Sequence, residues 1–273
     1  MRALLVLGRI SNLPTVWSNC FAAWLLAGGG PWSRFALVCL GATFLYTGGM
    51  FLNDAVDQSF DRRYRPERPI PSGRIAARTV WILSSIWLLA GWALFLPLGK
   101  SAVLLSSALL GAIVLYDLVH KHTGFAPVLM AACRFLLYLA AASVVGDPGN
   151  PAVLWRAAAL AGYIVGLSYL ARGESKAAAS VWWTVVLLFV PILVALLQPG
   201  STMAIVLIFV AVQAGWTFWC LWGRTSAISW GVAGLLAGIV LVDCLAAVGH
   251  GFAADFLVLF VLALCLQRLA PAP

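Results

Sequence analysis

Long apolar runs follow one another along nearly the whole chain of 273 residues. Two examples are FALVCLGATFLYTGGMFL, residues 35–52, and VWWTVVLLFVPILVALL, residues 181–197. Runs of about 18 apolar residues are long enough to cross a bilayer as helices. Charged residues make up 10% of the chain, against about 25% in soluble domains. The sequence therefore predicts an all-α, polytopic membrane protein with a single domain over residues 1–273.

Glycine, proline and charged breaks divide the apolar runs into separate spans. Ten helices are expected, near 12–29, 35–55, 78–97, 101–119, 125–145, 152–172, 178–197, 202–222, 228–248 and 253–269. An alternative for the last of them is to lie along the membrane surface instead of crossing it.

The positive charges gather on one side of this predicted topology. With the N-terminus inside, the outer face receives only Arg34, Lys100 and Arg156. The inner face receives Arg2, Arg9, Arg62, Arg63, Arg65, Arg68, Arg74, Arg78, Lys121, Arg172, Lys176, Arg224 and Arg268. Basic loops face the cytoplasm. We therefore expect both termini to be cytoplasmic in an integral protein of a bacterial inner membrane.

Three further observations exclude other classes. The N-terminal segment MRALLVLGRISNLP has only a five-residue apolar run between two arginines, so we expect no cleaved signal peptide. The net charge of +8 follows the topology, and we expect no nucleic-acid partner. The six cysteines, at positions 20, 39, 133, 220, 244 and 265, stand singly in apolar runs and are expected to act as small hydrophobes.

The charged segment NDAVDQSFDRRYRPERPIPSGRI, residues 53–75, follows the second span at its inner end. Asp54, Asp57 and Asp61 are spaced three and four apart, which predicts one shared face of a continuing helix. Stacked carboxylates repel one another, and oxygen ligands of this kind suit Mg²⁺. The arginines after them suit a polyanion such as a diphosphate. The alternative for the arginines alone is that they only set the topology.

This segment resembles the first aspartate-rich motif of the UbiA superfamily of intramembrane prenyltransferases. The resemblance implies a ring of about nine transmembrane helices around a cavity that opens to lipid, with the tenth helix as an addition. It also implies Mg²⁺-dependent transfer of an isoprenoid group from an allylic diphosphate to an acceptor, commonly aromatic. On this reading Asp54, Asp57 and Asp61 bind the metal, with Asn53 and Arg68 beside the diphosphate.

The segment LYDLVHKHTGF, residues 115–125, ends the fourth predicted span on the same side. The family places a tyrosine here with a lysine four residues later, and Tyr116 matches the tyrosine. Position 120 is histidine, and Lys121 comes one residue late, so Lys121 reaches a phosphate only if the helix ends or bulges first. We expect His120 and His122 to be interfacial residues, since Mg²⁺ prefers oxygen ligands.

The family's second aspartate-rich motif typically has several acids, and this chain has fewer there. The segment GLSYLARGESKAA offers one acid, Glu174, together with Arg172 and Lys176. Glu174 is expected to hold a second Mg²⁺ completed by water and diphosphate, with Arg172 as a substrate contact. The alternative is a site that has lost its second metal and its activity. The ARGE sequence resembles the EboC-like branch of the superfamily.

Polar residues inside the predicted spans are further candidates. Arg134 lies about nine residues into the fifth span, where an unpaired charge is costly; we expect it to face the diphosphate or line the site, and the alternative partner is Asp117. Asn12 and Asn19 in the first span are expected to contact substrate or to bond between helices. Asp243 lies near the outer side, too far from the inner motifs to join the site.

Three functions agree with these residues. The first is a prenyltransferase acting on an aromatic or quinone-precursor acceptor, with Asp54, Asp57 and Lys121 as catalytic residues. The second is a terpene cyclase that ionises the same donor. The third is a non-catalytic membrane protein that keeps a relic diphosphate site.

Overall fold

The computed structural model describes residues 2–173, 182–197 and 225–269, with the single positions 209, 211, 212 and 215. Within these residues the ordered elements are helices, and no strand occurs. The all-α prediction is therefore confirmed. The elements are α1 (Arg2–Leu7), η1 (Ile10–Asn12), α2 (Leu13–Leu26), α3 (Trp32–Val56), α4 (Gln58–Tyr64), α5 (Ala77–Ala93), η2 (Leu96–Leu98), α6 (Lys100–Val119), α7 (Ala126–Ala142), α8 (Pro151–Gly173), α9 (Trp182–Leu196), α11 (Thr225–Ala246) and α12 (Ala253–Leu269).

Every predicted span matches one of these helices, except 202–222, which lies almost wholly outside the described residues. The first helix begins at Leu13, because residues 10–12 form a 3-10 turn and Pro14 occupies the first helical turn. The short helix α1 was not predicted, and the region of α4 was predicted only as a continuation of the second span. Within the described residues, four helices are long and apolar enough to cross a membrane by length and composition, at Trp32–Val56, Ala77–Leu98, Lys100–Val119 and Pro151–Ala171.

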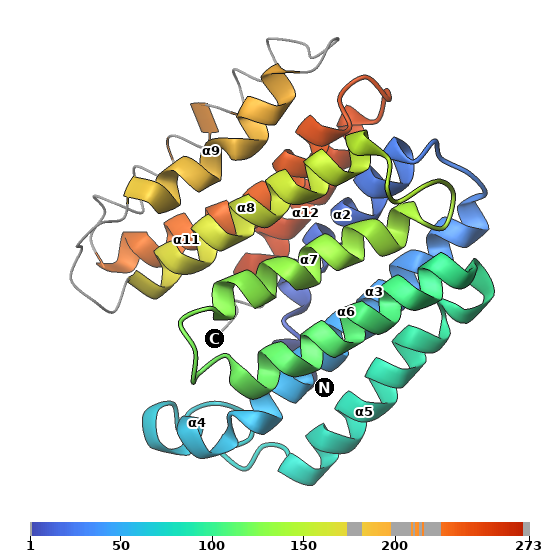
Figure 1. Ribbon diagram of the computed structural model, residues 1–273. Coiled ribbons are helices and arrows are strands. Elements are labelled where there is room, and N and C mark those ends of the chain that lie inside the picture. The colour runs from blue at the N-terminus through green and yellow to red at the C-terminus, as the bar shows by residue number, and fades with distance from the viewer. Residues whose placement is uncertain are drawn as a thin grey trace.

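The helices pack side by side as a bundle, with α9 at one edge and α5 at the other (Figure 1). Along the bundle α3 packs against α5, α6 against α7, and α8 against both α7 and α9. Helix α2 contacts α3, α7, α11 and α12, which places it inside the bundle. Helix α12 packs against α11, α2 and η1. The last predicted helix is therefore part of the bundle.

The two ends of the bundle differ in chemistry. At one end, α1 packs near the end of α3, and Leu7 and Phe51 share a small apolar cluster. The acidic segment after α3 lies at this end, which is called the motif end below. At the opposite end of α2 the contacts are aromatic, through Phe21, Trp24, Trp32, Phe35, Phe252 and Phe256. Among the described residues, the buried acids lie at the motif end and in the interior.

Glycine allows α3 and α5 to approach closely. A Cβ atom at Gly91 of α5 would lie 2.7 Å from the backbone nitrogen of Leu45 and 2.9 Å from the carbonyl oxygen of Gly41. Both neighbours are backbone atoms of α3, which cannot move aside without shifting the helix. Small residues permit this kind of close helix packing inside membranes. Gly91 therefore fixes the position of α3, which carries the acidic segment.

We expect Gly91→Ala to destabilise the bundle by about 1–3 kcal/mol, because the added methyl group overpacks the contact between α3 and α5. The unfolding temperature of the detergent-purified protein measures this loss. Gly111→Ala on α6 is the matched control, since nothing lies within 4 Å of a Cβ atom there. Equal unfolding temperatures for the two variants would contradict the packing account.

Candidate active site

The acidic segment is interrupted at Asp57. Helix α3 ends at Val56 and α4 begins at Gln58, with Asp57 between them. The predicted continuing helix with three acids on one face is therefore wrong in this detail. Asp54 and Asp61 share one partner, whereas Asp57 bonds to the end of α6.

Arg68 is the shared partner of Asp54 and Asp61. Its Nη1 atom donates to Asp61 Oδ2 at 2.8 Å and to Asp54 Oδ1 at 3.3 Å. The three side chains are between 2% and 5% exposed. Arg9 adds a second cation, 3.6 Å from Asp54 Oδ1. Arg68 was predicted to lie beside the diphosphate; the structure shows it bonded to the acids, and the predicted substrate contact stays a prediction.

Arg9 and Asp117 join this site from other helices. Arg9 Nη2 lies 3.4 Å from Asn53 Oδ1, and Asn53 Nδ2 donates to Asp117 Oδ1 at 3.1 Å. Arg9 is held in the left-handed region, with a φ of 42°; a residue other than glycine rarely adopts this conformation outside functional sites. Sequence reasoning did not assign Asp117 to the site, although an acid inside an apolar span is a signal for function.

Asp57 lies against the end of α6. Lys121 Nζ is 2.8 Å and His120 Nε2 3.4 Å from Asp57 Oδ2, and Lys121 lies 3.6 Å above the ring of Phe60. Lys121 comes one residue later than the lysine of the family pattern. Because α6 ends at Val119, before Lys121, the side chain can still reach Asp57. Burial raises the pKa of Asp57, but hydrogen bonds from His120 and Lys121 outweigh it and leave the pKa lowered. Burial lowers the pKa of His120, and the bond to Asp57 outweighs it and leaves the pKa raised.

Two hollows adjoin this motif end. A groove of about 610 Å³ is lined by residues that include Asp57, Phe60, His120 and Lys121. A cavity of about 510 Å³ lies inside the bundle, between α2, α3, α6, α7, α8 and α11. This central cavity is of the size that small-molecule sites have. Its polar lining residues are Arg9, Asn12, Tyr46, Arg65, Tyr116, Asp117, Arg134 and Ser168.

The central cavity has a polar mouth and an apolar wall. Arg9, Arg65, Tyr116 and Asp117 line its motif end, and aliphatic side chains from several helices line the rest. These aliphatic residues include Val16, Leu45, Leu109, Ile113, Leu137, Ile164, Leu236 and Ile239. A ligand with a charged head and a long apolar tail fits this division. Tyr116 lies beside the cavity with its ring stacked on His120, and its predicted contact with the diphosphate stays a prediction.

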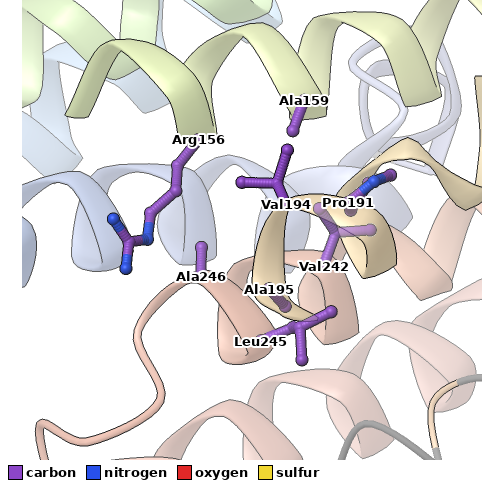
Figure 2. Close-up of a pocket in the computed structure, with 8 residues that line it drawn as sticks. All are labelled: Arg156, Ala159, Pro191, Val194, Ala195, Val242, Leu245 and Ala246. Atoms are coloured by element: carbon purple, nitrogen blue, oxygen red, sulfur yellow. The ribbon is translucent and has the colours of Figure 1, made fainter. Parts of the chain in front are cut away.

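A third, smaller hollow lies between α8, α9 and α11 (Figure 2). Its volume is about 10 Å³, which is no more than one water molecule requires. Arg156 stands at its edge with the guanidinium directed away from Val194 and Pro191. This hollow cannot receive a substrate. The central cavity, with its polar mouth and apolar wall, is the candidate site.

Arg134 lines the central cavity, and its predicted contact with the diphosphate stays a prediction. It donates to Thr15 and Asn19 of α2, and neither Asp117 nor another described carboxylate forms an ion pair with it. Asn19 Nδ2 in turn donates a hydrogen bond to Asp243 Oδ2 at 2.6 Å. Because Arg134 donates to Asn19 Oδ1, Asn19 links Arg134 to Asp243. Asp243 was left out of the predicted site; it is not among the described residues that line the central cavity, and it reaches Arg134 through the Asn19 amide. Asn12 and Asn19 lie on different elements, η1 and α2, and not on one helix face.

The donor chemistry at the motif end fits Mg²⁺. Asp54 Oδ2, Asp61 Oδ1 and Asp117 Oδ2 are buried and have no hydrogen-bond partner within the described part of the chain. Mg²⁺ binds one or two carboxylates and completes its shell with water and phosphate oxygens. Among the described residues no group of three or more acids, histidines or cysteines is gathered tightly enough to hold a metal by itself. The carboxylate oxygens at the motif end thus fit a metal ion that binds together with a phosphate ligand.

Glu174 and Lys176 lie outside the described residues. Arg172 is in the last turn of α8, and its side chain lies outside the described part as well. The predicted roles of Glu174 and Arg172 stay predictions.

The model of the UbiA prenyltransferase family matches residues 12–177, more than half of the chain. The chain belongs to the UbiA prenyltransferase family. With its apolar helices, this makes it an integral membrane protein. Among curated proteins it is similar to 4-hydroxybenzoate octaprenyltransferases from Pectobacterium carotovorum, 31% identical over 152 residues, and Pectobacterium atrosepticum, 32% identical over 152 residues. Each alignment covers 54% of this chain and 52% of the relative, so the chain spans about half the length of the curated relatives it matches.

Two solved structures are similar to this UbiA-family chain in fold. A UbiA homolog from Aeropyrum pernix K1 has a TM-score of 0.68 at 15% identity, over 89% of this chain and 97% of that one. A structure of digeranylgeranylglyceryl phosphate synthase has a TM-score of 0.64 at 17% identity, over 91% and 97%. At these identities the likeness concerns the fold.

Arg68→Gln should destabilise this UbiA-family chain by about 3–5 kcal/mol, because it leaves two buried carboxylates without their shared cation. The unfolding temperature of the purified protein measures the loss, and added Mg²⁺ should raise that temperature more in the variant than in the wild type. Arg62→Gln, at an exposed position of α4, is the control. Adding Asp61→Asn to Arg68→Gln should recover part of the stability. An Arg68→Gln variant as stable as Arg62→Gln would contradict the assignment.

Proposed function

We propose that this chain is a Mg²⁺-dependent intramembrane prenyltransferase, with residues 1–273 as one domain. It would move an isoprenoid group from an allylic diphosphate to an aromatic or quinone-precursor acceptor. The names of the curated relatives, which are octaprenyltransferases of an aromatic acid, support an aromatic acceptor. The same proposal covers the partners: an isoprenoid diphosphate, a lipophilic or aromatic acceptor, and the lipid bilayer.

The observation that carries the proposal is the position of the unpartnered carboxylate oxygens. Asp54 Oδ2, Asp61 Oδ1 and Asp117 Oδ2 are buried within the motif end of the bundle, and Asp117 lines a cavity of about 510 Å³ with an apolar wall. Buried acceptors without partners are costly. A metal-bound diphosphate at the mouth, with its prenyl tail along the apolar wall, would satisfy both features at once.

The chain's own residues would bind and orient the donor. Asp54 and Asp61 would hold Mg²⁺, together with Asp57, and Asn53 and Arg9 would lie beside the diphosphate. When bound, Mg²⁺ supplies positive charge that stabilises a departing diphosphate. Arg65 and Tyr116 line the mouth, where they can donate to phosphate oxygens. Donors placed before the reaction stabilise the developing negative charge without reorganising.

Lys121 would act at the leaving group. Its ammonium now contacts Asp57 at 2.8 Å, and it would turn from that carboxylate to a phosphate oxygen when the donor binds. The positive charge of Arg68 would offset the repulsion between the carboxylates of Asp54 and Asp61. Glu174, with Arg172 nearby in sequence, would hold a second Mg²⁺ from the end of α8.

Bond changes in the cavity follow from this placement. The allylic C–O bond breaks, and the diphosphate leaves with the electron pair. A carbon of the electron-rich acceptor ring bonds to the allylic carbon, and the ring then loses a proton. The aliphatic walls exclude water, which would otherwise capture the allylic cation.

Asp54→Asn should lower turnover by about 10²-fold or more, because it removes one negative ligand from the metal position. The assay incubates the purified full-length protein with Mg²⁺, allylic diphosphates of several lengths and aromatic acceptors, and measures prenylated product by mass together with released diphosphate. Asp255→Asn, at an exposed position of α12, is the control for loss of an acid. Full turnover in Asp54→Asn would contradict the proposal, and diphosphate release without any acceptor would indicate the cyclase.

The orientation in the membrane is part of the proposal. Both termini and the motif end would face the cytoplasm of a bacterial inner membrane, as thirteen basic residues on that side against three on the other favour. The packing of α1 and α12 near the motif end supports a common side for the two chain ends.

An impermeant maleimide should fail to label Arg65→Cys in intact spheroplasts and should label it in inside-out vesicles. The exposed Cys265 is replaced by serine in this background. Asp147→Cys, in the loop at the opposite end, is the control and should show the reverse pattern. Efficient labelling of position 65 from outside would overturn the orientation.

A further inference from the structure

The groove of about 610 Å³ lies at the motif end of the bundle, between α4 and the end of α6 (Figure 1). It is separate from the central cavity, and of the described residues Asp117 alone lines both hollows. A hollow of this size can hold a small ligand. Helix α4 contributes four side chains to its wall, those of Ser59, Phe60, Arg63 and Tyr64. The proposed prenyl transfer gives none of these four a role.

The groove continues into the lipid-facing side of α6. Helix α6 is long and apolar enough to cross a membrane, and the groove lies at its last turn. A stripe of exposed positions spaced seven, four and three apart leads away from the groove along one face of this helix. The positions are Leu104, Gly111, Leu115 and Leu118, of which Leu118 lines the groove itself. Acyl chains are as apolar as leucine, so this stripe offers a path for one of them.

Two aromatic side chains of α4 are exposed beside the groove. Phe60 is 41% exposed and Tyr64 is 61% exposed, and their ring centroids lie 4.6 Å apart. Aromatic side chains with a polar tip gather at the membrane–water interface, where the ring lies among the lipid headgroups. The exposed pair therefore indicates that this face of α4 lies in the headgroup layer.

The wall of the groove offers hydrogen-bond donors to an anion. Arg63 is exposed and forms no ion pair with any described residue. Ser59 and His122 are exposed on the same wall. A hydroxyl group and an imidazole ring can each donate one hydrogen bond, and a guanidinium can donate several. Together these side chains suit the oxygens of a phosphate group.

The acids of the groove are covered. Asp57 is buried and pairs with Lys121, whose ammonium lies 2.8 Å from its carboxylate. Asp117 is buried and accepts a hydrogen bond from Asn53. The exposed charges on the wall thus belong to Arg63 and Lys121, and the groove presents positive charge to the membrane surface.

We propose that this groove binds one anionic phospholipid of the leaflet at the motif end. The lipid phosphate accepts hydrogen bonds from Arg63, Ser59 and His122, and one acyl chain follows the exposed stripe of α6. Basic side chains at a membrane surface attract anionic headgroups. A soluble phosphate would use the donors but would leave the stripe unoccupied, and a neutral headgroup would not match the charge.

A lipid in the groove would hold α4 against the end of α6. Asp61 lies on a different face of α4, and its Oδ2 atom accepts a hydrogen bond from Arg68 at 2.8 Å. The lipid would therefore help to fix one of the acids of the motif end. Lipid binding itself does not depend on the proposed prenyl transfer.

Lipid titration of the purified full-length protein, followed by native mass spectrometry, tests the inference. The probes are dioleoylphosphatidylglycerol and dioleoylphosphatidylcholine, which share their acyl chains and differ in headgroup charge. A chelator removes divalent metal ions. The wild type should bind one phosphatidylglycerol about tenfold or more tightly than it binds phosphatidylcholine, on the scale of a hydrogen bond to a charged group. Equal binding of the two lipids would overturn the inference.

Variants on neighbouring positions of α4 assign the preference to the groove. Arg63→Gln should weaken the first phosphatidylglycerol about tenfold and leave phosphatidylcholine unchanged. Arg62→Gln is the matched control, because Arg62 is exposed on the same helix but does not line the groove. It should change the affinity by about threefold or less, since exposed charges are screened. Unfolding temperatures check that both variants are folded. An equal loss in the two variants would reduce the effect to general surface charge and contradict the assignment.

Competitors identify the occupant. Glycerophosphoglycerol carries the headgroup without acyl chains and should not displace the lipid at millimolar concentration; displacement would assign the groove to a soluble phosphate. An unreactive allylic thiolodiphosphate should also leave the lipid bound, and displacement would make the groove a part of the donor site and overturn the inference. None of these measurements involves turnover. A chain that binds the lipid through Arg63 but yields no prenylated product would keep the lipid site and lose the proposed function, and the reverse result would do the opposite.

Discussion

Every charge buried in the membrane interior needs a partner within the bundle, and this constraint organises the chain. Asp54 and Asp61 both pair with Arg68. Asp57 pairs with Lys121 and His120. Asp243 accepts hydrogen bonds from Ser18 and Asn19. Because water is absent from the bilayer core, each unpaired group would cost several kcal/mol. The close packing at Gly91 sets α3 against α5 and so fixes where this row of acids lies.

These pairings are incomplete in a way that indicates chemistry. Arg68 uses one oxygen of Asp54 and one of Asp61, and the other oxygen of each stays buried without a partner in the described part of the chain. A purely structural ion pair gains nothing from such oxygens. A metal ion that arrives with a diphosphate would use them, and Arg68 would hold the site together when no ligand is bound. Structure and function thus depend on the same carboxylates.

The sequence predicted the helices well, because apolar length and Gly/Pro breaks determine spans almost independently of tertiary contacts. It also indicated the motif end, because acids in an otherwise apolar chain are costly to bury without a ligand or partner. It did not predict partners. The link from Arg134 to Asp243 depends on how α2, α7 and α11 are rotated about their axes, and residue spacing does not determine that rotation. The place of Arg68 on Asp54 depends on the path of the loop after α4, which spacing does not determine either. Asp117 was overlooked as a site residue because it was considered only as a partner for Arg134. Glu174 lies outside the described residues, so its role rests on sequence alone.

The central claim is that the free oxygens of Asp54 and Asp61 form a Mg²⁺-dependent diphosphate site. Calorimetric binding of an unreactive allylic thiolodiphosphate to the purified protein, with and without Mg²⁺, tests it most directly, because no acceptor or turnover is involved. The account predicts binding that requires Mg²⁺ and is lost in the Asp54→Asn, Asp61→Asn double variant, while the protein remains folded. Binding of equal strength without Mg²⁺, or in the double variant, would contradict it.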